Sequence, residues 1–138
     1  MTLDEWIEQY NSKTPEKFER DTRYELFFNP ERGFCEVGEM DGMIVINQLC
    51  GDARYFKDKV DEAARASGIK IGGTWCIRKE IKAYIRLFGY KIIETYKLSD
   101  GNERYVCVHK KTGKGARVSP SFYYKDSRIQ AYFITWQI

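Results

Sequence analysis

The residues best suited to chemistry form one short segment, Gln48-Leu49-Cys50-Gly51-Asp52-Ala53. Gly51 and Ala53 are small, so the backbone N–H groups beside them can approach a bound anion closely. The segment that follows has helical periodicity, and the N-terminus of a helix favours phosphate. These features predict a pyrophosphate-binding turn. An ordinary strand-to-helix turn with Asp52 as the helix N-cap explains the same residues.

Two further side chains have types that take part in catalysis. Cys50 lies near the start of the predicted helix, where a thiolate nucleophile is stabilised, although a small buried hydrophobe is the simpler interpretation. His109 is the single His of the chain. His often acts as a general acid or base, but this one alternates with Tyr105 and Cys107 along a strand-like segment and has no apparent acidic partner.

The elements that must position these residues follow from hydrophobic periodicity. A helix is predicted over 2–11, with Thr2 and Glu5 as a capping box, and a further helical turn at 15–20. Asp41-Gly42 is a strong hairpin signal. The remaining expected elements are strands 24–28, 34–40 and 43–46, helix 54–67, strand 69–77, helix 80–88, and strands 91–98, 104–109, 116–124 and 131–137.

This order predicts an α/β fold with flanking helices, as a single domain over residues 1–138. The sheet is expected to be mixed and mostly antiparallel. Its one parallel pair would join strands 43–48 and 70–77 through the helix at 54–67, because a β–α–β unit pairs its strands in parallel.

The order of elements, together with the Q-x-x-G-x-A pattern at 48–53, resembles the GNAT superfamily of N-acyltransferases over residues 22–95. The resemblance implies a GNAT-like fold that binds acetyl-coenzyme A and transfers its acetyl group to an amine. It also implies a set of cofactor-binding residues, with pantetheine near Ile46 and Trp75. That set is Ile46, Gln48, Cys50, Gly51, Asp52, Ala53 and Arg54.

Two catalytic residues are implied by the same resemblance. Glu36 lies on the central hairpin, where the general base of a GNAT enzyme can lie, although exposed carboxylates are common there. Many GNAT enzymes carry a Tyr four residues before a terminal Gly, as the acid that protonates the leaving thiolate. Gly89 matches that Gly, Ile85 stands four residues before it, and the adjacent Tyr84 is the candidate acid.

Charge is divided unevenly along the chain. Residues 1–68 carry 9 Lys and Arg against 15 Asp and Glu, whereas residues 69–138 carry 14 against 5. The basic half favours an anionic partner, either a phosphate-bearing cofactor, a nucleic acid or an acidic protein. Aromatic and basic residues mix at Tyr123-Tyr124-Lys125 and Lys110-Lys111, as on single-stranded nucleic-acid surfaces. Neutralisation between the two halves is the alternative explanation.

These patterns leave two functions open, an N-acetyltransferase and a GNAT-like binding module without transferase activity that uses its basic half on a nucleic acid or a protein. No run approaches the ~20 apolar residues of a membrane span, and the acidic N-terminus lacks the features of a secretory signal. The four cysteines are widely spaced, so reduced, buried thiols in a cytoplasmic protein are expected and a zinc site is not.

Overall fold

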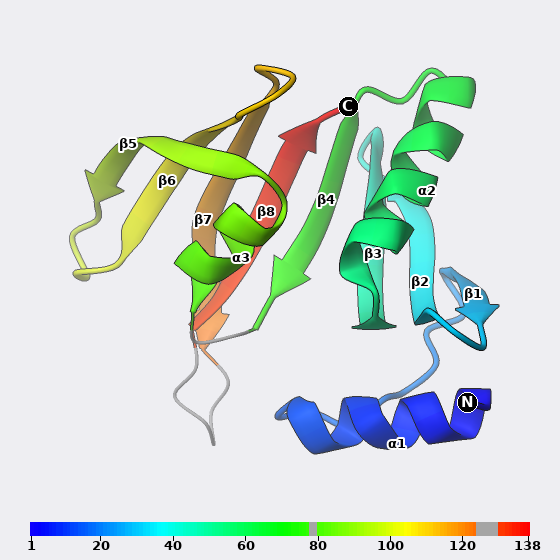
Figure 1. Ribbon diagram of the computed structural model, residues 1–138. Helices are drawn as coiled ribbons and strands as arrows, with labels where there is room; N and C mark the ends of the chain where they lie inside the picture. The colour runs from blue at the N-terminus through cyan, green and yellow to red at the C-terminus, as the bar shows by residue number, and fades with distance from the viewer. Residues whose placement is uncertain (78–79, 124–129) are drawn as a thin grey trace. The chain divides into compact units, whose positions relative to one another are not determined.

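The computed structural model describes residues 1–77, 80–123 and 130–138. The chain forms two compact units, Met1–Gly72 and Gly73–Ile138 (Figure 1). Each unit contains strands and at least one helix, and antiparallel pairing joins β1 to β2, β2 to β3, β5 to β6, β6 to β7 and β7 to β8. The expected α/β class and the mostly antiparallel pairing are therefore confirmed. The parallel pair expected between 43–48 and 70–77 would join the two units and stays a prediction.

The first unit is an antiparallel three-stranded meander with two helices. Its strands β1, β2 and β3 pair in chain order. Helix α1 contacts β2 and β3, and helix α2 contacts β3. The predicted capping box of Thr2 and Glu5 is confirmed at the start of α1. The elements are α1 (Leu3–Lys13), β1 (Glu25–Asn29), β2 (Gly33–Met40), β3 (Met43–Gly51) and α2 (Ala53–Ala66).

The core beneath α1 is aromatic. Trp6, Phe34 and Cys50 are buried together, and burial of a large apolar side chain contributes about 1.5–3 kcal/mol. The indole Nε1–H of Trp6 donates to the carbonyl oxygen of Pro30 at 3.1 Å, which satisfies the polar atom of that side chain. This contact ties α1 to the turn after β1.

Two boundaries differ from those expected in this unit. The prediction of a helical turn at 15–20 is wrong, because α1 ends at its C-cap Thr14 and residues 15–20 are not helical. The backbone N–H of Phe18 instead donates to Asn11 Oδ1 at 2.6 Å, which folds the chain back onto α1. Strand β3 continues to Gly51, beyond the expected end at residue 46, because β2 pairs with it along its whole length.

The hairpin between β2 and β3 turns at Asp41-Gly42, as predicted. The φ angles are 52° at Asp41 and 78° at Gly42, and two consecutive positive values are typical of a type I′ turn. This turn suits the twist of a tight antiparallel hairpin, so here local sequence is sufficient to specify the structure.

The second unit is a sheet in the order β4-β8-β7-β6-β5 with helix α3 on one face (Figure 1). The predicted strand containing Pro120 is confirmed as β7, and a register shift between Pro120 and Phe122 accommodates the missing N–H. Tyr124 lies outside the described residues. The elements are β4 (Ile71–Cys76), α3 (Ile81–Leu87), β5 (Tyr90–Lys97), β6 (Glu103–His109), β7 (Gly115–Tyr123) and β8 (Gln130–Gln137).

The two faces of this sheet differ in character. On one face the register aligns buried Cys107 with Ala116, and Ala116 with Trp136. Helix α3 packs on this face, since the Nζ of its Lys82 lies 5.6 Å from the ring centre of Tyr105. Residues between these positions along each strand point to the opposite face.

Candidate functional site

Glu36, the predicted general base, is a fully buried carboxylate with 0% exposure. Its Oε1 accepts from Asn47 Nδ2 at 3.0 Å and from Gln48 Nε2 at 2.6 Å. Its Oε2 accepts from the backbone N–H of Asp21 at 2.8 Å and forms an ion pair with Arg20 Nη1 at 2.5 Å. Four donors therefore surround this carboxylate.

A β-bulge in β3 explains how two neighbouring amides reach one carboxylate. Cys35 of β2 pairs with Leu49, but the next aligned residue, Val37, pairs with Ile46. β3 thus has one extra residue opposite Glu36, and in such a bulge two residues face one on the partner strand. The consecutive Asn47 and Gln48 interrupt an apolar run in the sequence, and this was the available signal for a buried polar network.

The network favours a structural role for Glu36. A general base needs an oxygen directed at a substrate proton, whereas both oxygens here already accept hydrogen bonds. Gln48, predicted to bind the cofactor, is also held by Glu19. The same Nε2 donates to the carbonyl oxygen of Glu19 at 2.6 Å, and Gln48 Oε1 accepts from the N–H of Glu19 at 3.3 Å. The structure brings these two predicted residues together as partners of each other, and their roles in catalysis stay predictions.

The predicted pyrophosphate turn is mostly strand. Gln48–Gly51 belong to β3, and the backbone N–H of Asp52 donates to Arg32 O at 2.8 Å. Asp52 is the N-cap of α2, as predicted, because its Oδ1 accepts from the N–H of Tyr55 at 3.0 Å. Its Oδ2 pairs with Arg32 Nη1 at 2.7 Å. The Tyr55 N–H and then the Arg32 guanidinium hold the pKa of Asp52 below its usual range.

The backbone at position 51 requires a Gly for structural reasons. Gly33 and Gly51 face each other across β2 and β3, with φ angles of 115° and 113°. A Cβ on Gly51 would lie 2.0 Å from Arg32 O, and one on Gly33 would lie 1.9 Å from Cys50 O. The close approach of the two strands is therefore enough to explain a Gly at position 51.

The other predicted cofactor residues have different environments. Ile46 and Cys50 are buried in β3, and Cys50 belongs to the core beneath α1. Ala53 is the first residue of α2 and is half-buried, and Arg54 beside it is exposed. Of this group, Arg54 is the side chain best placed to meet an anion at the N-terminus of α2.

Tyr84 and His109 lie in the second unit, whereas Glu36 lies in the first. The Tyr84 ring on α3 packs against Phe88 with centroids 5.8 Å apart. The Nδ1 of His109 accepts from the N–H groups of Lys111 at 3.1 Å and Thr112 at 3.2 Å, so His109 stabilises the turn after β6.

All four cysteines are buried and none is in a disulfide, as the sequence predicted. Burial raises the pKa of Cys35 to about 12 and that of Cys107 to about 11. Both thiols are therefore protonated near neutral pH. A nucleophilic cysteine needs the thiolate form, so neither thiol is suited to that role.

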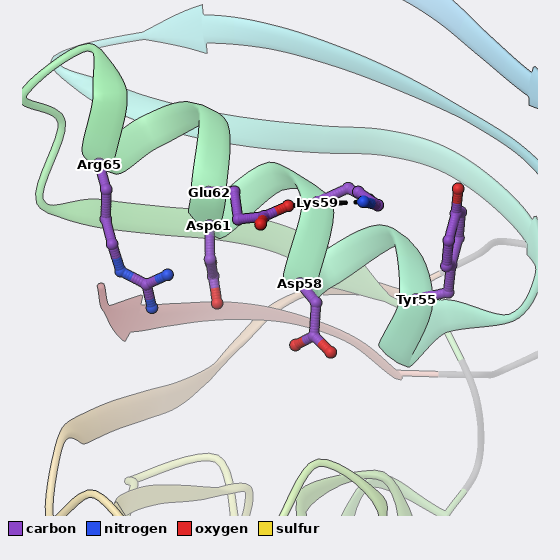
Figure 2. A pocket seen from close by; sticks show the side chains of 6 residues that line it. All are labelled: Tyr55, Asp58, Lys59, Asp61, Glu62 and Arg65. Atoms are coloured by element: carbon purple, nitrogen blue, oxygen red, sulfur yellow. Dashed lines mark ion pairs between the residues drawn. The ribbon is translucent and has the colours of Figure 1, made fainter.

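A hollow of 440 Å³ lies on the outer side of α2 (Figure 2). All six of its lining residues come from this one helix, and Figure 2 shows the ion pair between Lys59 and Glu62 among them. The hollow is unsuited to a phosphate, because three of its side chains are carboxylates. The lining residues are Tyr55, Asp58, Lys59, Asp61, Glu62 and Arg65.

The open face of the second sheet, opposite α3, combines cations with aromatic rings. Register places Tyr96 of β5 beside Arg104 of β6, and Val106 beside Arg117 of β7. Tyr96 is 50% exposed, and both arginines are exposed. Sequence reasoning missed this face because its members lie on different strands, and only the pairing register brings them together.

The same face continues across β8 to β4. Phe133 faces Ser119 of β7, and its ring lies 5.0 Å from that of Trp75, centre to centre. Both rings are half-buried. Among the described residues of this face, Glu94 is an anion; it accepts the hydroxyl hydrogen of Tyr96 and thereby raises the pKa of that phenol.

No family model matches this chain, and no curated protein matches it. Within residues 1–77, 80–123 and 130–138, no group of His, Cys, Asp or Glu side chains is arranged to hold a metal ion. The helices of the described chain are too short or too polar to cross a membrane.

Proposed function

We propose that this protein is a binding module for single-stranded nucleic acid, and that the open face of the second unit is its binding surface. One observation carries this proposal. Exposed Arg104 and Arg117 lie between exposed Tyr96 on one side and the Trp75–Phe133 ring pair on the other. Unpaired bases stack on such rings, while cations neutralise the phosphates that run between them.

The charge of this part of the chain supports the same ligand. Residues 69–138 carry 14 basic against 5 acidic residues, an excess that attracts polyanions. A duplex keeps its bases stacked on one another, so its bases cannot stack on the rings of this face. A single strand is therefore the nucleic acid that matches both the aromatic and the basic side chains of the face.

Binding should be measured by fluorescence anisotropy with a labelled single-stranded oligonucleotide of about 12 residues at about 50 mM salt. Tyr96→Ala should weaken binding by about 1–3 kcal/mol, which is roughly fivefold to 150-fold in Kd, because a stacked base is lost. Tyr96→Phe keeps the ring and should bind nearly as the wild type does. Replacing Arg104 and Arg117 with Gln should reduce the slope of log Kd against log salt by about 1.4.

Three lysines elsewhere in the second unit provide a control that distinguishes binding at this face from non-specific electrostatic attraction. Lys110, Lys111 and Lys114 lie in the turn between β6 and β7, at one end of the sheet. Replacing all three with Gln should weaken binding less than replacing the two arginines of the face. Equal binding of a duplex of the same sequence, or no anisotropy change with the wild type, would contradict the proposal.

A second candidate function is binding of an acyl-coenzyme A at the N-terminus of α2, with or without acetyl transfer. The observation that favours it is the presence of two arginines at this helix end. Arg54 is exposed, and Arg32 pairs with Asp52 Oδ2 at 2.7 Å. Phosphate oxygens are natural partners for both guanidinium groups. The GNAT resemblance supplies the remainder of this hypothesis.

Thermal unfolding with and without about 1 mM acetyl-coenzyme A tests the second candidate, since a ligand that binds the native state raises Tm. Asp52→Asn should increase this shift, because Asn still caps α2 while Arg32 is released from its carboxylate. Asp58→Asn makes the same charge change further along α2 and should leave the shift unchanged. Identical Tm values with and without coenzyme for wild type and Asp52→Asn would remove this candidate.

A further inference from the structure

Strand β1 is an edge strand with little of the usual protection against pairing. It lies at the end of the sheet order, and its sequence is Glu-Leu-Phe-Phe-Asn. Phe27 is 48% exposed and Phe28 is 40% exposed, on opposite faces of the strand. β1 contains no Lys or Pro, and its register with β2 has no bulge. Natural edge strands normally carry such features or other charged side chains, because an open edge can pair with another chain. The one charged residue of β1 is Glu25, at its first position.

The edge strand of the second unit makes a useful contrast. β5 also lies at the end of the sheet order and exposes Ile93, but it begins and ends near Lys91 and Lys97. Its pairing with β6 has a register shift between Ile92 and Glu94. Lysines and bulges both oppose pairing along an edge, so β5 is better protected than β1.

We propose that β1 is the surface through which two copies of this chain associate, as an antiparallel β1–β1 pair with a twofold axis at Phe27. In this register Phe27 faces Phe27 of the second copy, and Leu26 faces its Phe28. Glu25 faces Asn29, so no like charges oppose each other within the strands. Apolar pairs across antiparallel strands are favourable, and a twofold contact uses the same surface on both copies.

The residues that flank β1 are complementary in the same arrangement. The twofold axis that pairs Glu25 with Asn29 brings Arg23 towards Glu31 of the second copy, and Glu31 towards its Arg23. The Arg23 side chain is 81% exposed although its Nη2 also pairs with Asp21 Oδ2 of its own copy at 2.7 Å, and Glu31 is exposed in the turn after β1. Two opposite-charge contacts thus bracket the apolar pairs. This complementarity favours a second copy over an unrelated partner.

Sedimentation equilibrium of the full chain tests the proposal. At about 100 µM protein, the wild type should have twice the 16.3 kDa mass of one chain. Phe27→Lys should raise the dimer Kd roughly tenfold or more, because an edge lysine opposes pairing. Ile93→Lys is the matched control, since Ile93 is 50% exposed on the other edge strand, and it should not change the mass.

The charged flanks give a second test that does not alter the strand. Arg23→Glu should raise the dimer Kd about fivefold, and the double variant Arg23→Glu with Glu31→Arg should restore it, since both pairs are then reversed. A monomeric wild type at about 100 µM would overturn the proposal. So would loss of the dimer in Ile93→Lys with retention in Phe27→Lys, or a double variant weaker than the single one.

Discussion

Glu36→Gln should lower the free energy of unfolding by about 3 kcal/mol. The buried Glu36 carboxylate is the acceptor for four donors, and the neutral amide would remove its charge and place an NH₂ group against some of them. Arg20 is the only charged donor of the four, and the rest are amide groups that would be left without a full partner. Urea unfolding monitored by circular dichroism measures the change, as a lower midpoint at an unchanged m-value.

Glu39→Gln is the matched control on the same strand. Glu39 is exposed, so the identical change there should alter the free energy of unfolding by less than about 0.5 kcal/mol. Equal midpoints for Glu36→Gln and the wild type would contradict the structural role of the network. Retained stability with loss of an acetyl-transfer activity would instead support Glu36 as the general base.

Gly51→Ala should have a comparable effect, about 3–4 kcal/mol, for a different reason. The new Cβ would lie 2.0 Å from the carbonyl oxygen of Arg32, a backbone atom that cannot move aside without disturbing the β2–β3 pair. The φ angle of 113° is also one that residues with a side chain rarely adopt. Thermal or urea unfolding in the absence of any ligand measures this loss.

Gly42→Ala isolates the conformational part of that effect. Gly42 also has a positive φ, 78°, but a Cβ there meets no atom within 4 Å. Its replacement should therefore cost about 1 kcal/mol, the strain without the clash. If Gly51→Ala were no more destabilising than Gly42→Ala, the close strand contact would be wrong, and the need for a Gly at 51 would have to come from a ligand.

Much of the local structure could be predicted from the sequence alone. The capping box of Thr2 and Glu5 and the Asp41-Gly42 turn depend on residues a few positions apart, so local chemistry is enough to specify them. The N-cap role of Asp52 is similar. Helix and strand periodicity likewise gave the order of elements and the α/β class. The prediction of a helical turn at 15–20 was wrong, because the local preference for a helix there is weak. The hydrogen bond from the Phe18 N–H to Asn11 Oδ1 folds this segment back onto α1 instead.

The candidate sites depended on contacts that sequence does not display. An extra residue in β3 turns Asn47 and Gln48 towards Glu36, and no periodicity predicts where such a bulge occurs. The basic and aromatic face of the second unit likewise exists only once register aligns β5, β6, β7 and β8. Side-chain type and spacing along the chain determined which groups were available for chemistry. Strand register decided which of them are buried as partners of each other and which remain exposed to a ligand, because a shift of one residue moves a side chain to the other face of a sheet.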